Sequence, residues 1–173
     1  MPATTDADME THYDVIVIGA GHAGCEAAHA CAKLGLKTVL FTLHLDSLAN
    51  LPCNPSIGGT AKGQIVREID ALGGIMGKVA DECAIQMRML NRSKGPAVFS
   101  PRAQMDRSRY HVVMKHVLED LPGLDIRQAH ITDLLTDDSL SQAAGVMTES
   151  GAIYKAGAVV ICSGTYMQSR TIR

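Results

Sequence analysis

The chain of 173 residues lacks several features that would each point to a particular class of protein. It has no apolar run near the ~20 residues that a membrane-spanning helix needs. Residues 1–12 are polar and acidic, without the basic start and apolar stretch of an export signal. The five cysteines are odd in number and include no C-x-x-C pair, and the seven histidines show no metal-ligand spacing. We therefore expect a reduced, cytoplasmic protein with no membrane segment and no metal, in which residues 1–12 form a flexible tail.

The strongest positive signal is a glycine pattern near the start of the chain. An apolar run over residues 15–18 is followed by glycines at 19, 21 and 24, and then by a run that suits a helix. In a G-x-G-x-x-G turn between strand and helix, Gly19 permits the tight turn, Gly21 lets the backbone approach a pyrophosphate, and Gly24 lets the helix pack closely. The N-terminus of that helix offers N–H groups and a positive dipole end to phosphates. The residues expected to contact a dinucleotide here are Gly19, Ala20, Gly21, His22, Ala23 and Gly24.

Strand and helix signals alternate along the chain and predict an α/β fold. The expected elements are a strand–helix–strand unit at 13–18, 22–34 and 37–42, helices at 60–72 and 104–120, strands at 124–128 and 130–135, a hairpin of 145–147 with 152–155, and a closing strand at 158–162. Residues 76–104 mix short apolar pieces with basic residues. The expected class is a Rossmann-like FAD/NAD(P)-binding domain over residues 13–173, with a parallel central sheet and a small antiparallel β element.

Two features bear on which dinucleotide is bound. The acidic residue that usually ends the second strand and holds the ribose is missing, because that strand ends at Thr42. The Thr42 hydroxyl could bond the ribose instead, and Asp46 is an alternative that could equally be an exposed loop acid. The closing strand runs into Gly164, which permits close backbone approach. Similar strands return near the cofactor in flavoproteins with two dinucleotides, so the order of segments favours FAD over NAD.

Cys53 differs from the other cysteines because it lies in a loop directly after the second strand. Ligands bind at the carboxyl ends of parallel strands in open α/β sheets, so a thiolate there could act as a nucleophile or redox partner. A packed loop thiol is the alternative. The second cysteine that a dithiol reductase needs, about five residues on, is missing. The cysteines in apolar segments, expected to be small buried hydrophobes, are Cys25, Cys31 and Cys162.

A basic stretch covers residues 88–109, where six lysines and arginines stand against a single acid, Asp106. Such a stretch predicts contact with a polyanion, either a cofactor phosphate or an RNA backbone. A solvated basic face is the alternative. The only aromatic residues in or directly after this stretch are Phe99 and Tyr110, which leaves little for base stacking.

Several segments together resemble the glucose-inhibited division protein A family, whose members are the FAD-dependent subunit of the tRNA uridine 5-carboxymethylaminomethyl modification enzyme. They are GAGHAGCEAA at 19–28, CNPSIGG at 53–59, Gly63, REIDALGG at 67–74, LNRSKGPAV at 90–98 and RAQMDR at 102–107. The resemblance runs from about residue 13 to the end of the chain. A threonine at position 42 in place of an acid also fits this family.

The resemblance implies an enzyme that works with a GTPase subunit and adds a (carboxymethyl)aminomethyl group to C5 of the wobble uridine of tRNA. Methylenetetrahydrofolate would supply the carbon, glycine or ammonium the nitrogen, and FAD with NADH the redox chemistry. Residues 19–24 would bind the FAD phosphates, and the backbone of Ile131 would meet the adenine end. Asn54 and Lys62 would line the flavin side, and Cys53 would assist catalysis by attack on C6 of uracil.

Family members run to several hundred residues and are expected to form homodimers. The resemblance therefore implies that this chain is an N-terminal part of the FAD-binding domain, without the NADH-handling insertion and the C-terminal domain, and that it does not turn over alone. Three alternatives stay open. They are the related folate- and FAD-dependent tRNA uridine methyltransferase, which usually has an acid where Thr42 stands, a generic FAD-dependent oxidoreductase, and a bare nucleotide-binding or interaction module.

Overall fold

The structure is a computed structural model that describes residues 11–52, 54–137, 139 and 141–167. Its elements in chain order are β1 (Thr11–Ile18), α1 (His22–Lys33), β2 (Thr38–Thr42), η2 (Leu45–Ser47), β3 (Ser56–Gly58), α2 (Gly63–Ala71), α3 (Met76–Cys83), β4 (Ala84–Leu90), η3 (Pro96–Val98), β5 (Ser100–Met105), α4 (Arg107–Glu119), β6 (Leu124–Gln128), β7 (Ile131–Thr136), β8 (Ala143–Thr148) and β9 (Ile153–Ile161). The strands form two sheets, with the orders β6-β2-β1-β9-β8-β7 and β3-β5-β4.

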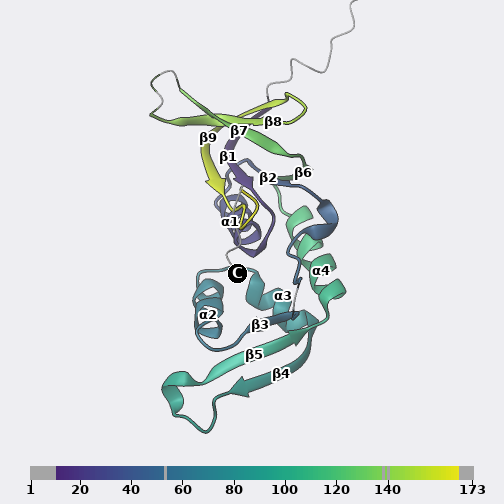
Figure 1. The fold of residues 1–173 in the computed structure, drawn as a ribbon, viewed down its shortest axis with the longest axis vertical. Helices are drawn as coiled ribbons and strands as arrows, with labels where there is room; N and C mark the ends of the chain where they lie inside the picture. The colour runs from purple at the N-terminus through teal and green to yellow at the C-terminus, as the bar shows by residue number, and fades with distance from the viewer. Residues whose placement is uncertain (1–10, 53, 138, 140, 168–173) are drawn as a thin grey trace, which may run out of the picture.

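The larger sheet combines a parallel half with an antiparallel half. Strands β6, β2, β1 and β9 run parallel, while β8 pairs antiparallel with β9 and β7 pairs antiparallel with β8. The smaller sheet is wholly antiparallel. Figure 1 shows the β7–β8–β9 meander at one end of the molecule and the β4–β5 hairpin at the other, with α1 and α3 between them. The predicted class, a Rossmann-like parallel sheet with an additional antiparallel element, is confirmed.

Burial on both faces of the larger sheet explains why its parallel strands are so apolar. Every residue of β2 is buried, as expected for a central parallel strand. On one face, Val15, Val17 and Leu40 pack in a core with buried residues of α1, α3 and α4. On the other face, Ile16 and Phe41 pack in a second core with residues of β8 and β9. The alternation of β1 between these two cores fixes its register in the centre of the sheet.

Most of the predicted elements are present, with some shifts of their bounds. The hairpin of 145–147 with 152–155 is confirmed by the pairing of Val146 with Tyr154. The expected closing strand is not separate, because residues 153–161 form the single strand β9. The helix expected from 60 begins at Gly63, since residues 59–62 form a turn with positive φ at Gly59 and Ala61. The helix expected from 104 begins at Arg107.

Residues 76–105 hold a helix and two strands that the sequence did not predict. The start of α3 depends on Glu26 of α1, whose carboxylate accepts hydrogen bonds from the backbone N–H of Ile75 at 3.1 Å and of Met76 at 2.6 Å. A carboxylate at the N-terminus of a helix accepts from its free N–H groups and interacts favourably with the positive end of the helix dipole. Glu26 therefore joins α1 to α3 across about fifty residues of sequence.

Candidate functional site

The turn between β1 and α1 is pressed against the end of β9. Gly19 has φ +100°, and a Cβ there would lie 2.5 Å from the carbonyl oxygen of Cys162. A Cβ at Gly24 would lie 1.7 Å from the carbonyl oxygen of Gly19. The N–H of Cys162 in turn donates to the carbonyl of Ile18 at 2.7 Å. Because backbone atoms block both positions, these two glycines are required by the packing of the fold.

Gly21 is in the opposite situation. No heavy atom of the described residues lies within 4 Å of the position that its Cβ would occupy, and the residue is exposed at the N-cap of α1. No side chain caps the helix, and its first turn carries no acidic residue. The first N–H groups of α1 therefore lie beneath an open surface, which is the arrangement that a pyrophosphate needs. The glycine turn thus fits the phosphates of a dinucleotide.

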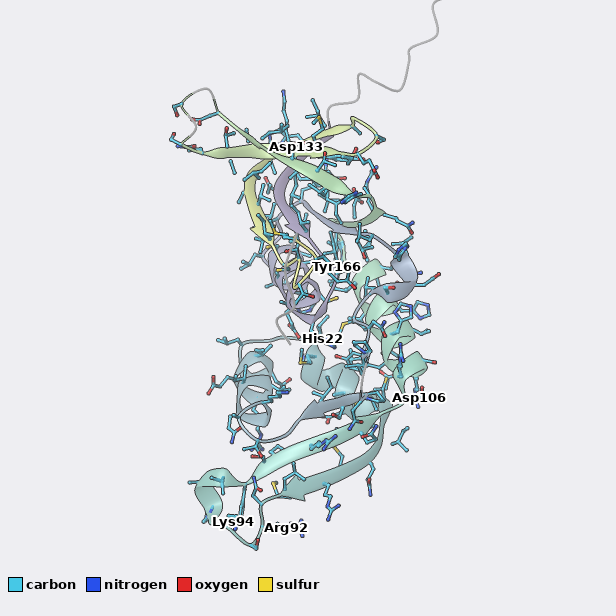
Figure 2. The ribbon with its side chains drawn as sticks, viewed as in Figure 1. His22, Arg92, Lys94, Asp106, Asp133 and Tyr166 are labelled. Atoms are coloured by element: carbon cyan, nitrogen blue, oxygen red, sulfur yellow. The ribbon has the colours of Figure 1, made fainter. Side chains whose placement is uncertain are left out.

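A cavity of about 620 Å³ opens beside this turn. That volume is in the usual range for a small-molecule site. It is lined by His22 from the turn, by Asn54 from the segment before β3 and by Lys62 from the turn before α2. Met76 of α3 and Arg102 of β5 also line it, and they belong to the elements that the sequence missed. Figure 2 shows His22 in the middle of the molecule, between the larger sheet and the elements α2 and α3.

Two buried polar atoms near the cavity have no hydrogen-bond partner in the part of the chain that the structure describes. They are Nε2 of His22 and the hydroxyl of Tyr110, whose rings lie 5.8 Å apart between centroids. Burial lowers the pKa of His22 and raises the pKa of Tyr110, so both side chains are neutral near pH 7. Because buried polar atoms are normally paired, Nε2 of His22 fits a ligand held in the cavity.

The other predicted cofactor residues lie near the carboxyl ends of the parallel strands. Thr42 ends β2, and its hydroxyl donates to the carbonyl of His44 at 3.2 Å, which leaves its lone pairs for a ribose. The N–H of Ala129 donates to the carbonyl of Thr42 at 3.0 Å, so the start of β7 at Ile131 lies near the end of β2. Gly164, with φ +58°, lies in the turn after β9. The acid at position 46 is exposed in η2.

The cysteines differ in how far they match expectation. Cys25 and Cys83 are buried, while Cys31 and Cys162 are half-buried. Burial raises the pKa of all four thiols, that of Cys25 to about 12, so none is a thiolate near pH 7. Cys53 lies outside the described residues. In the described ranges, no three His, Cys, Asp or Glu side chains are placed to hold a metal ion, and no helix is long and apolar enough to span a membrane.

Comparison with known proteins identifies the family. A sequence model described as glucose inhibited division protein A matches residues 14–173. The chain belongs to this family. Among relatives, the tRNA uridine 5-carboxymethylaminomethyl modification enzyme MnmG of Caldicellulosiruptor saccharolyticus is 61% identical over 160 residues, which is 92% of this chain and 25% of the relative. The enzyme of the same name from Chloroflexus aurantiacus is 56% identical, over 95% of this chain and 25% of the relative.

Solved structures agree with the family and with the fold. The structure of GidA from Aquifex aeolicus matches 90% of this chain and 26% of that chain, with a TM-score of 0.86 and 51% identity. A probable FAD-dependent monooxygenase from Pseudomonas aeruginosa matches with a TM-score of 0.64 but 15% identity, which shows the fold alone. The chain spans about a quarter of the length of the curated relatives it matches. The family match confirms the resemblance drawn from residues 19–107.

Proposed function

We propose that this chain forms the FAD-binding part of a tRNA-modifying flavoprotein. Together with a GTPase subunit, the whole protein would add a (carboxymethyl)aminomethyl group to C5 of the wobble uridine in the cytoplasm, acting as a homodimer. The names of the relatives support the tRNA uridine as substrate. The single observation that supports the cofactor is the glycine turn, where backbone atoms block a side chain at Gly19 and Gly24, while no described residue lies near a Cβ at Gly21. The 173 residues alone are not expected to turn over.

Two regions of this chain would bind the two halves of the cofactor. The N–H groups at the start of α1, above Gly21, would hold the pyrophosphate, and Thr42, Ile131 and Gly164 would meet the adenosine side. His22, Asn54 and Lys62 line the cavity, and they would lie on the flavin side of the bound cofactor. FAD supplies two-electron redox chemistry when bound, with NADH and methylenetetrahydrofolate as co-substrates. His22 is neutral and presents Nε2, while Lys62 adds a positive charge beside the flavin.

Cys53 is the thiol that we propose to assist catalysis. The pKa values of the four described thiols are raised by burial, so they are poor nucleophiles. Position 53 adjoins Asn54, which lines the cavity. Its thiolate would form a bond from sulfur to C6 of uracil and move the ring's electron pair to C5. Bond formation at C5, loss of the C5 proton and departure of the thiolate would restore the ring.

A ligand comparison tests the cofactor assignment. FAD should raise the thermal midpoint of the protein, because a ligand at 100 times its dissociation constant adds about 2.7 kcal/mol of stability. Riboflavin is the matched control, since it carries the same ring without the diphosphate and adenosine. It should raise the midpoint far less at equal concentration. Equal shifts for FAD and riboflavin would show that the glycine turn holds no diphosphate.

A cysteine comparison in the intact enzyme tests the role of Cys53. Cys53→Ser should abolish tRNA modification while FAD still raises the thermal midpoint. Cys31→Ser is the matched control, because that thiol is half-buried on α1, and it should retain activity. Full activity of Cys53→Ser would remove this residue from the reaction.

A further inference from the structure

Two positively charged side chains lie opposite each other on one face of the β4–β5 hairpin. Arg88 and Arg102 are direct cross-strand partners, and Gln86 and Gln104 form the adjacent pair. Because side chains alternate along a strand, these four lie on the same face. They line a depression of about 180 Å³. We call this surface the arginine face. The alternate side chains of β5 are buried, so the arginine face is the outward side of that strand.

The fold itself does not explain this pair of arginines. Like charges directly opposite each other in an antiparallel sheet are destabilising. Neither Arg88 nor Arg102 takes part in any ion pair found among the described residues. Arg102 is half-buried and Arg88 is exposed. An arrangement that repels within the free protein is stabilised when an anion binds between the two groups.

The surroundings indicate what kind of anion this is. Residues 84–105 contain four basic side chains and no acidic one, although the whole chain has a net charge of −2. The other two, Arg92 and Lys94, are exposed at the tip of the hairpin (Figure 2). Arg102 also lines the large cavity, so positive charge extends from the cavity to the tip. A long basic track suits a polymer of phosphates better than a single small anion.

We propose that the arginine face docks the phosphodiester backbone of the RNA substrate beside the cavity, an inference that rests on the proposed function. Guanidinium groups bind phosphate oxygens in a bidentate manner, and the two glutamine amides can donate to phosphate or sugar oxygens. The arginine face carries no aromatic side chain for stacking on a base. Its contacts therefore position the strand without reading its sequence, and they leave the cavity for the reacting base.

Salt-dependent RNA binding by the intact protein tests this assignment. Binding of a fluorescently labelled tRNA that carries the target uridine is measured by anisotropy over a range of salt concentrations. Arg88→Gln should reduce the magnitude of the slope of log affinity against log salt by about 0.7 to 0.9, the value for one phosphate contact. If the two proteins bind equally at 1 M salt, this change of slope corresponds to about fourfold to sixfold weaker binding at 0.15 M salt. Arg88→Lys should keep the slope, and Lys33→Gln, an exposed charge at the far end of α1, should leave it unchanged.

Two further readouts separate binding from structure. Without RNA, Arg88→Gln should unfold at the same or a higher denaturant concentration than the unsubstituted protein, because it removes a repulsion. Its stabilisation by FAD should be unchanged, since Arg88 lies outside the large cavity. If the unsubstituted protein binds tRNA and Arg88→Gln binds it with the same salt slope, the arginine face is not the docking surface for RNA, while the proposed function stands. If the unsubstituted protein binds FAD but no tRNA, both the proposed substrate and this docking surface are overturned.

Discussion

The three glycines of the turn should respond to alanine in two opposite ways. At Gly24 the added methyl would stand 1.7 Å from a backbone oxygen, where a carbon–oxygen contact needs about 3.3 Å. The backbone of α1 or of the turn would have to move by more than an ångström. Overpacking usually costs about 1–3 kcal/mol. Since the obstacle is backbone rather than a flexible side chain, we expect Gly24→Ala to lower the free energy of unfolding by at least about 3 kcal/mol.

Gly21→Ala should leave the fold intact and remove the ligand. Its φ of −71° is open to alanine, and none of the residues that the structure describes has a heavy atom within 4 Å of the new methyl. Alanine lowers the entropy of the unfolded chain, which stabilises the protein, but it is a poorer N-cap than glycine, which destabilises it. The two effects nearly cancel, so the free energy of unfolding should change by less than about 1 kcal/mol. The methyl would nevertheless occupy the space that the pyrophosphate needs. An overpacking penalty of about 1–3 kcal/mol on the bound state corresponds to roughly fivefold to 150-fold weaker FAD binding.

Two measurements on each variant check this reasoning. Denaturant unfolding without ligand reports the fold, and quenching of flavin fluorescence reports FAD affinity. Gly19→Ala serves as a second structural variant, because its φ of +100° and a contact of 2.5 Å both oppose a side chain. The reasoning is refuted if Gly21→Ala binds FAD as the unsubstituted protein does. It is also refuted if Gly21→Ala is destabilised as much as Gly24→Ala.

Three further substitutions or conditions probe the surroundings of the turn. Glu26→Ala should lower the free energy of unfolding by about 2–3 kcal/mol in denaturant titrations, because it leaves buried N–H groups at the start of α3 without acceptors. Glu26→Gln, which keeps an acceptor, should lose about 1 kcal/mol. Burial lowers the pKa of His22 and His29 in the folded state. The unfolded chain therefore binds more protons below about pH 6.5, and stability should fall as the pH drops, by up to about 1.4 kcal/mol per pH unit for each histidine. A pH-independent unfolding midpoint between pH 7 and 5 would contradict this. Tyr110→Phe should raise the stability of the ligand-free protein by about 1 kcal/mol, since it removes a buried hydroxyl that has no hydrogen-bond partner among the described residues.

The part of the fold that sequence could predict is the part whose causes are local. The turn at 19–24 needs glycines at fixed spacing, and the run before it is apolar because β1 is covered on both faces. The pairing of β8 with β9 was predictable for the same reason, since a short turn joins two neighbouring segments. In each case the residues that determine the structure lie within a few positions of the structure itself.

The elements that were missed have distant causes. Apolar and polar residues do alternate along β4 from Ile85 to Met89, but Ile85 and Met87 on its apolar face are exposed, so the alternation marks no buried face of a core. What makes it a strand is its pairing with β5 beyond a nine-residue connection. The start of α3 depends on a carboxylate of α1, which no local pattern reveals. Asp106, by contrast, is a local signal: its side chain accepts from the N–H of Arg109 at 3.0 Å and marks the first residue of α4.

The candidate site likewise has one part whose residues are contiguous in sequence and one part whose residues come from distant segments. Its phosphate end is a contiguous turn, and the same fold, at 15% identity, occurs in a probable monooxygenase. Its cavity end is assembled from His22, the two segments on either side of β3 that carry Asn54 and Lys62, the start of α3, and the strand that carries Arg102. Fold does not set the substrate, whereas the side chains gathered in a cavity do. Substitutions at Gly21 should therefore affect cofactor binding with any RNA substrate, while substitutions at Arg102 should change how the RNA is positioned.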